Sequence, residues 1–165
     1  MGMLDVVLTI INVILAVVSA LGAWNSIKYF RKSKNLRIFA QTNKALVEVQ
    51  KMLIKLPDAL SASNSLRRGK KGLSLHNTLC DIGKELNANL TAINSNIPTE
   101  YSDVIRQLQN KNGFNLQAYI NSYISGDVVQ NNGIDLDDFN VCQARLLEIQ
   151  DYLKKAALET EEKLK

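Results

Sequence analysis

An uncharged apolar run near the N-terminus constrains this chain more than any other feature of its sequence. Val6 to Trp24 read VVLTIINVILAVVSALGAW, nineteen residues without a charge. As an α-helix this run would be about 28 Å long, close to the hydrocarbon thickness of a bilayer. A buried core helix is usually shorter or has a polar face. A cleaved signal peptide begins with positive charge, whereas this chain has Asp5. We therefore predict one transmembrane helix within residues 1–27.

The charges that follow the run predict its orientation. A basic juxtamembrane linker occupies residues 28–37, with the cations Lys28, Arg31, Lys32, Lys34 and Arg37. Basic residues accumulate on the cytoplasmic side of a membrane helix, and they also contact anionic lipid. We therefore expect a single-pass protein of the inner membrane. Its N-terminus is expected outside, and residues 38–165 are expected in the cytoplasm. The charge asymmetry is large: residues 1–75 carry twelve Lys/Arg and three Asp/Glu, and residues 76–165 carry eight and thirteen.

Polar residues inside the apolar run share one helical face. Thr9, Asn12 and Ser19 fall on that face together with small alanines, at steps of three and four residues. An asparagine in the middle of a bilayer is costly when it faces lipid. We therefore expect this face to contact another copy of the chain in a homo-oligomer, or to line a pore. The alternative is that the hydroxyls bond to their own backbone and that Asn12 is tolerated.

The remainder of the chain predicts an all-α cytoplasmic domain of four to six helices. Apolar residues recur every seven positions at Phe39, Leu46, Leu53 and Leu60, interleaved with Thr42, Val49 and Leu56. The pattern fits a coiled coil between chains or core packing within one. We expect Pro57 to interrupt this helix. Further helical patterns end at Asn96 and at Asn112. Residues 114–124 fit a helix or a strand, and a last helix starting near Asp135 or Asp137 is expected to end before the charged tail ETEEKLK.

A cationic loop is the candidate ligand site. Residues 61–72 read SASNSLRRGKKG, in which four cations lie close together: Arg67, Arg68, Lys70 and Lys71. Arginine and lysine bind phosphate oxygens, and flanking glycines allow a close approach of the backbone. A solvated basic loop near an anionic membrane is the alternative. In a homo-oligomer the loops would form one positive cavity suited to a compact polyanion, with Tyr119 or Tyr123 as candidate base contacts.

The sequence gives no support to enzyme chemistry. His76 is the single histidine, Cys80 and Cys142 lack the spacing of a metal site, and no phosphate-binding glycine motif occurs. We therefore expect no catalytic residues, no metal, no cofactor and no binding of duplex nucleic acid.

The order of these features resembles the small membrane effectors of type III CRISPR antiviral signalling. The match is one of layout over the whole chain: the span Val6–Trp24, the basic linker Lys28–Arg37 and the cationic loop Arg67–Lys71. The resemblance implies a cytosolic oligomeric domain that binds a cyclic oligoadenylate, and a membrane part that then perturbs the bilayer. The competing hypothesis is a membrane-tethered adaptor whose helices recruit a protein partner.

Overall fold

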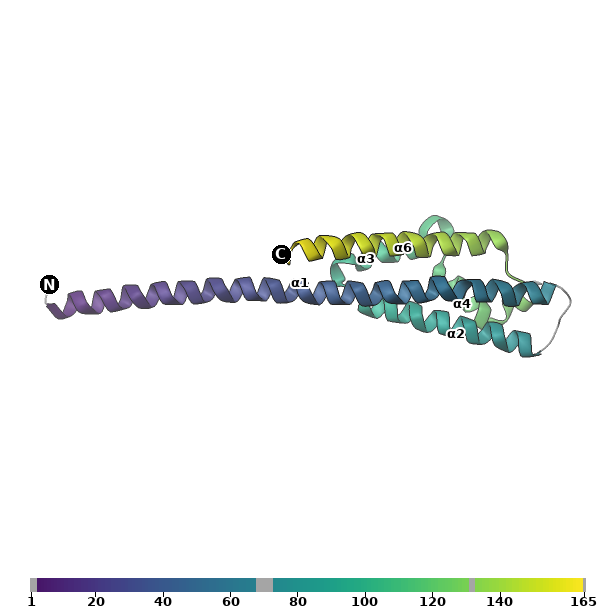
Figure 1. Ribbon diagram of the computed structural model, residues 1–165, viewed down its shortest axis with the longest axis horizontal. Coiled ribbons are helices and arrows are strands. Elements are labelled where there is room, and N and C mark those ends of the chain that lie inside the picture. The colour runs from purple at the N-terminus through teal and green to yellow at the C-terminus, as the bar shows by residue number, and fades with distance from the viewer. Residues whose placement is uncertain (1–2, 68–72, 131–132, 165) are drawn as a thin grey trace.

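The computed structural model describes residues 3–67, 73–130 and 133–164, with the backbone alone described for residues 3–10, 65–67, 73–75 and 129–130. Its dominant element is helix α1, Met3–Arg67, a single helix of 65 residues. At 1.5 Å per residue this helix is about 97 Å long. Its N-terminal part extends alone, and its C-terminal part runs along the other helices (Figure 1). The apolar run and the first helix of the bundle are therefore one continuous element.

Pro57 lies inside α1, so our expectation of an interruption there was wrong. A proline inside a helix removes one backbone hydrogen bond and crowds the carbonyl four residues earlier. Pro57 is exposed, so water can reach the carbonyl that loses its partner. Beyond it, Ala59 and Ser63 are completely or almost completely buried in the bundle. The burial of this last part of α1 holds the helix together through the proline.

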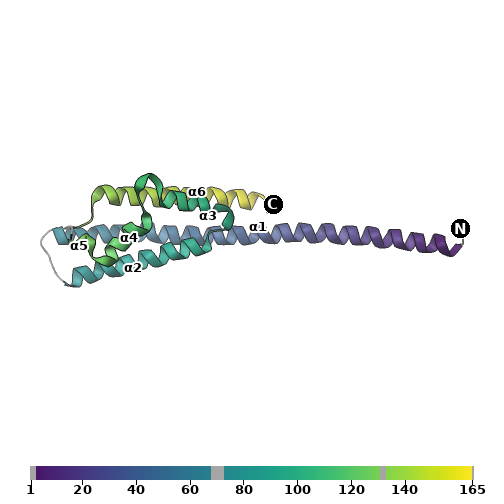
Figure 2. The same ribbon diagram turned by 180° about the vertical axis from the view of Figure 1, so that it is seen from behind.

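Two long helices pack against the C-terminal part of α1. They are α2, Leu73–Asn96, and α6, Leu136–Glu162, and the two views show α6 running back toward the N-terminal half of α1 (Figures 1 and 2). Three shorter helices, α3 (Thr99–Gln109), α4 (Leu116–Ser125) and α5 (Asp127–Gln130), complete the bundle with a 3-10 turn, Lys111–Gly113. The described ranges contain helices and no strand, which confirms the all-α prediction. Residues 116–125 are helical, which settles the open choice between helix and strand.

The heptad stripe of α1 is filled by its own chain. The fully buried positions of α1 follow steps of three and four residues: Thr42, Ala45, Val49, Met52, Leu56, Ala59 and Ser63. The predicted positions Thr42, Val49 and Leu56 belong to this stripe. Leu46, Leu53 and Leu60 flank it and are half-buried against the same core. The core is completed by α2 and α6. Packing within one chain, rather than a coiled coil between chains, therefore accounts for the pattern.

Helix α4 lies very close to α2 at Gly83. A Cβ atom at this glycine would lie 2.8 Å from Cβ of Tyr123 and 2.9 Å from Cγ1 of Ile124. Real side chains do not approach so closely, so the contact needs a residue without a side chain. The glycine thereby fixes the position of α4, which forms one wall of the cavity described below.

The last helix is longer than the sequence suggested. We expected it to end before the charged tail, but α6 continues to Glu162. Ala156, Ala157 and Thr160 are buried near its end. The Thr160 hydroxyl donates to the Ala156 carbonyl at 2.7 Å and lies 3.3 Å from the Tyr101 hydroxyl of α3. This packing carries the C-terminal end of the chain back to the start of the bundle.

The part of α1 between Ile11 and Lys34 is not buried by any other described part of the chain. Every residue from Ile11 to Lys34 is exposed, including Val17, Val18 and Leu21 at 54–60%. Among the described residues, α1 holds the one segment long and apolar enough to cross a membrane. Exposing this many large apolar side chains to water costs free energy. We therefore expect the segment to lie in a nonpolar environment or against a partner.

Candidate functional site

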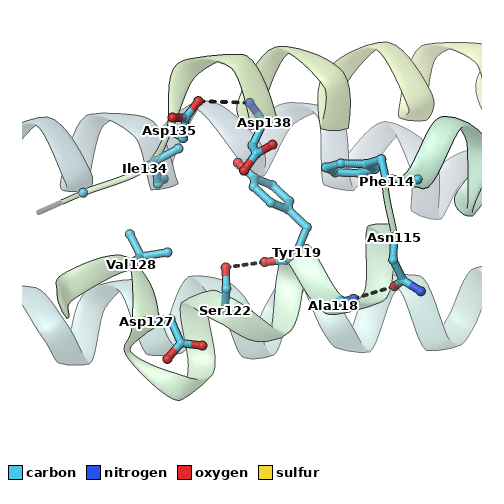
Figure 3. Close-up of a pocket in the computed structure, with 12 residues that line it drawn as sticks. Phe114, Asn115, Ala118, Tyr119, Ser122, Asp127, Val128, Ile134, Asp135 and Asp138 are labelled. Atoms are coloured by element: carbon cyan, nitrogen blue, oxygen red, sulfur yellow. Dashed lines mark hydrogen bonds between the residues drawn. The ribbon is translucent and has the colours of Figure 1, made fainter. Parts of the chain in front are cut away.

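A cavity of about 400 Å³ opens where α4, α5 and the start of α6 meet (Figure 3). Its wall includes Phe114 and Tyr119 on one side and the backbone around Ile134 on the other. Three carboxylates, Asp127, Asp135 and Asp138, also line it, and none of its described lining residues is a lysine or an arginine. The cavity is therefore acidic.

Helix caps place the residues around this cavity. Asn115 precedes α4 and its side-chain oxygen accepts the Ala118 N–H at 2.7 Å. Gly126 ends α4 with φ of 86°, a left-handed conformation that glycine adopts readily. Asp135 precedes α6 and accepts the N–H groups of Asp137 at 2.7 Å and Asp138 at 3.3 Å. The cap at Asp135 confirms the predicted start of the last helix.

Tyr119 lines the cavity, and Tyr123 lies buried behind it. The Tyr123 hydroxyl donates to the Tyr119 hydroxyl at 2.7 Å, and the two ring centres are 5.3 Å apart. Desolvation raises the pKa of both phenols well above the usual value. Both hydroxyls therefore stay neutral at physiological pH and can act only through hydrogen bonds. Tyr123 is buried and its hydroxyl already donates to Tyr119, so Tyr119, which lines the cavity, is the better placed of the two candidate base contacts. A base contact at either tyrosine stays a prediction.

The chemistry of this cavity differs from that of a phosphate site. Carboxylates accept hydrogen bonds and attract cations, and a polyanion would be repelled by three of them. One oxygen of Asp135 is already used by the helix cap, and the Asp127 carboxylate accepts the Ser125 hydroxyl at 2.6 Å. The described residues contain no group of three His, Cys, Asp or Glu side chains that could hold a metal ion. The cavity is suited to a small donor or cationic group.

The predicted phosphate residues lie largely outside the described part of the chain. Arg67 is the last residue of α1, with its backbone alone described, and Arg68, Lys70 and Lys71 fall outside the described residues. The phosphate site therefore stays a prediction.

The polar face of the apolar segment is only partly described. Asn12 and Ser19 are exposed on the projecting part of α1, and Thr9 is on the same helix with its backbone alone described. No residue of the described bundle covers Asn12 or Ser19. Their proposed contact with another copy stays a prediction.

The two cysteines and the single histidine have structural positions. Cys142 is buried, and desolvation raises the pKa of its thiol to about 12, so it stays a protonated, unreactive group. Cys80 is half-buried on α2. The His76 ring lies against Gly126, where a Cβ atom would be 2.8 Å from its Cε1 atom. His76 therefore helps to join α2 to the turn after α4.

The basic linker meets two parts of the chain that sequence reasoning did not connect with it. Lys34 forms an ion pair of 2.8 Å with Glu100, the second residue of α3. Lys163, just beyond α6, lines a groove together with Lys28 and Arg31. No local pattern in the sequence indicates either contact, because both depend on the return of α6 and α3 to the same level of α1.

Comparisons with known proteins add no identification: no family model, no curated protein and no solved structure matches this chain.

Proposed function

We propose that this protein is a single-pass membrane effector in which α1 links a membrane segment to a cytoplasmic helical bundle. The observation that carries the proposal is the continuity of α1, whose exposed apolar part and buried bundle part form one helix. A helix of this kind transmits movement because bending it or shifting it within the bundle displaces both ends. The five cations of the linker support a cytoplasmic bundle at the inner membrane.

Self-association in the membrane is part of this proposal. Asn12 and Ser19 are exposed on the segment that we assign to the bilayer. Polar groups in hydrocarbon favour contact with another helix, although such bonds contribute only about 0.6 kcal/mol each on average. A homo-oligomer would pair these residues and bring several bundles together. The output would then be pore opening or local perturbation of the bilayer.

The proposed trigger is an anionic nucleotide, with a cyclic oligoadenylate as the first compound to test. The cationic sequence Arg67–Lys71 begins at the last residue of α1, four residues after the buried Ser63. A ligand shifts a conformational equilibrium only through its different affinities for the two states. Binding next to the end of α1 would act on the element that reaches the membrane.

Thermal unfolding of the full chain in detergent micelles tests this trigger. A nucleotide at a hundredfold excess over its dissociation constant should stabilise the fold by about 2.7 kcal/mol, a visible rise in melting temperature. The variant Arg67→Ala/Arg68→Ala should lose the rise. The control Lys154→Ala/Lys155→Ala removes two exposed cations from α6 and should keep it. A rise that persists in the Arg67→Ala/Arg68→Ala variant would remove the loop from the proposal.

A membrane-tethered adaptor is the second candidate, and the acidic cavity favours it. Asp127, Asp135 and Asp138 suit a basic or hydrogen-bond-donating group of a protein partner better than a polyanion. In an adaptor, α1 would only hold the bundle at the membrane. The absence of any thermal shift with cyclic or linear nucleotides would favour this candidate.

A further inference from the structure

A second groove lies outside the bundle, at the level where the apolar segment ends. It has a volume of about 770 Å³ and lies between α1 and the C-terminal end of α6. Trp24 and Ile27 contribute apolar surface from α1, and Leu164 contributes it from beyond α6. Figures 1 and 2 both show the C-terminal end of the chain beside α1 at this level.

Four cations surround this groove. Lys28, Arg31 and Lys32 come from α1, and Lys163 comes from the opposite wall. None of the described lining residues is a carboxylate, and none of these three α1 cations forms an ion pair with another described residue. Lys163 also acts on one acidic group outside the groove, Glu100, which forms an ion pair with Lys34. The hydrogen bond from Lys34 lowers the pKa of Glu100, and the charge of Lys163 lowers it more weakly. The described lining of the groove therefore carries four positive charges and no negative one.

The arrangement on α1 is periodic. Trp24, Lys28, Arg31 and Asn35 are separated by steps of four, three and four residues, so they lie on one face of the helix. The apolar side chain comes first, at the end of the uncharged run, and the cations follow farther from it. This order matches a bilayer surface, where hydrocarbon gives way to phosphate, and tryptophan is the residue most typical of that boundary.

We propose that this groove binds the headgroup of an anionic phospholipid, with Lys163 closing the site opposite Lys28 and Arg31. The proposal rests on the proposed membrane crossing of α1. The cations would neutralise the lipid phosphate, and the guanidinium of Arg31 can bind two of its oxygens at once. Trp24, Ile27 and Leu164 would contact the glycerol region and the first part of the acyl chains. Such a lipid would contact both α1 and the end of α6. The packing of α6 on α1 would then depend on the anionic lipid content of the membrane.

The single tryptophan gives a direct test. Trp24 is the only tryptophan of the chain, so its fluorescence reports on the groove alone. The full chain is reconstituted in phosphatidylcholine vesicles that contain a small fraction of brominated lipid, a contact quencher. We expect brominated phosphatidylglycerol to quench Trp24 more strongly than the same fraction of brominated phosphatidylcholine, and the difference to shrink at high salt.

Variants of Lys163 distinguish lipid binding in the groove from lipid binding by the basic linker of α1 alone. Lys163→Gln should lower the preference for phosphatidylglycerol about fivefold, the factor that corresponds to ~1 kcal/mol for a basic residue near an anionic surface. Lys155→Gln, an exposed cation earlier on α6, should leave the preference unchanged. The groove proposal would be overturned if Lys163→Gln kept the wild-type preference for phosphatidylglycerol while Lys28→Gln lost it. The basic linker on α1 would then bind the lipid without Lys163. Equal quenching by both lipids would also overturn it. Quenching by neither lipid would place Trp24 away from the bilayer and contradict the proposed membrane crossing itself.

Discussion

Two lysines placed in the projecting part of α1 are expected to expel the chain from the membrane. Ile14 and Val18 are 56% and 60% exposed near the centre of the uncharged run. A lysine at the centre of a membrane helix costs about 2.5–3.5 kcal/mol in insertion, so the variant Ile14→Lys/Val18→Lys should lose ~5 kcal/mol. That loss corresponds to a shift of more than a thousandfold between the inserted and the uninserted chain.

The same helix offers a matched control. Val47 and Ile54 are also apolar and exposed, at 47% and 76%, but they lie on the part of α1 that belongs to the bundle. Val47→Lys/Ile54→Lys should therefore leave the chain in the membrane fraction. Membrane fractions washed with alkaline carbonate and probed for the protein give the measurement. If both double variants stay in the membrane, or if the unmodified chain is recovered in the aqueous fraction, then α1 does not cross the bilayer.

The loss of Glu148 is expected to destabilise the bundle. Arg145 of α6 is 8% exposed, and its Nη1 atom donates to Oε2 of Glu148 at 2.8 Å. Its Nε atom is buried and has no hydrogen-bond partner in the described chain. Glu148 also binds Lys111 at 3.2 Å. Removing one member of a buried ion pair costs about 3–5 kcal/mol, and because Glu148 is 38% exposed we expect ~2–3 kcal/mol for Glu148→Ala.

Denaturation by urea in detergent micelles measures this loss against two references. Glu159→Ala removes an exposed carboxylate from the same helix and should change the free energy of unfolding by less than about 0.5 kcal/mol. Arg145→Met combined with Glu148→Ala removes the buried charge as well and should recover most of the stability. A double variant as unstable as Glu148→Ala would show that the uncompensated arginine is not the cause.

The same ion pair predicts an acid dependence. Desolvation alone would raise the pKa of Glu148, but the hydrogen bonds and charges of Arg145 and Lys111 outweigh it and lower the pKa. A carboxyl whose pKa is lower in the folded state stabilises the fold above its unfolded pKa, near 4.3, and loses that contribution as the pH falls through the folded value. The difference in stability between wild type and Glu148→Ala should accordingly shrink below about pH 4.

Local patterns in the sequence predicted most of the helices. The apolar series from Leu79 to Ile93 is buried in α2, and the helix ends at Asn96 two residues before Pro98, as its sequence suggests. Asp135 caps α6 as expected. Propensity and capping are properties of neighbouring residues, so a single sequence contains them.

Tertiary packing explains the places where the expectations failed. Pro57 disfavours a helix, yet α1 continues through it because neighbouring residues such as Ala59 are buried against other helices. The tail of α6 is rich in glutamate and lysine, which are good helix formers, and Thr160 within it is buried, so its charge does not mark the end of the helix. The groove at Trp24 joins two segments that are more than 130 residues apart, so only the path of α6 reveals it. The acidic cavity likewise combines the ends of three helices. The cationic sequence Arg67–Lys71 was suggested as a ligand site by the local sequence, and it stays a prediction because Arg68, Lys70 and Lys71 lie outside the described residues.

The distance between two spin labels on α1 tests the central claim most directly. The labels are placed on Val17, in the apolar part, and on Gln50, an exposed residue of the bundle part, after Cys80 and Cys142 have been replaced. The 33 residues between them correspond to about 50 Å in an unbroken helix. In lipid nanodiscs the account predicts one narrow distribution near 50 Å, whereas a broad or much shorter distribution would show that the bundle is not joined to the membrane segment by a continuous helix.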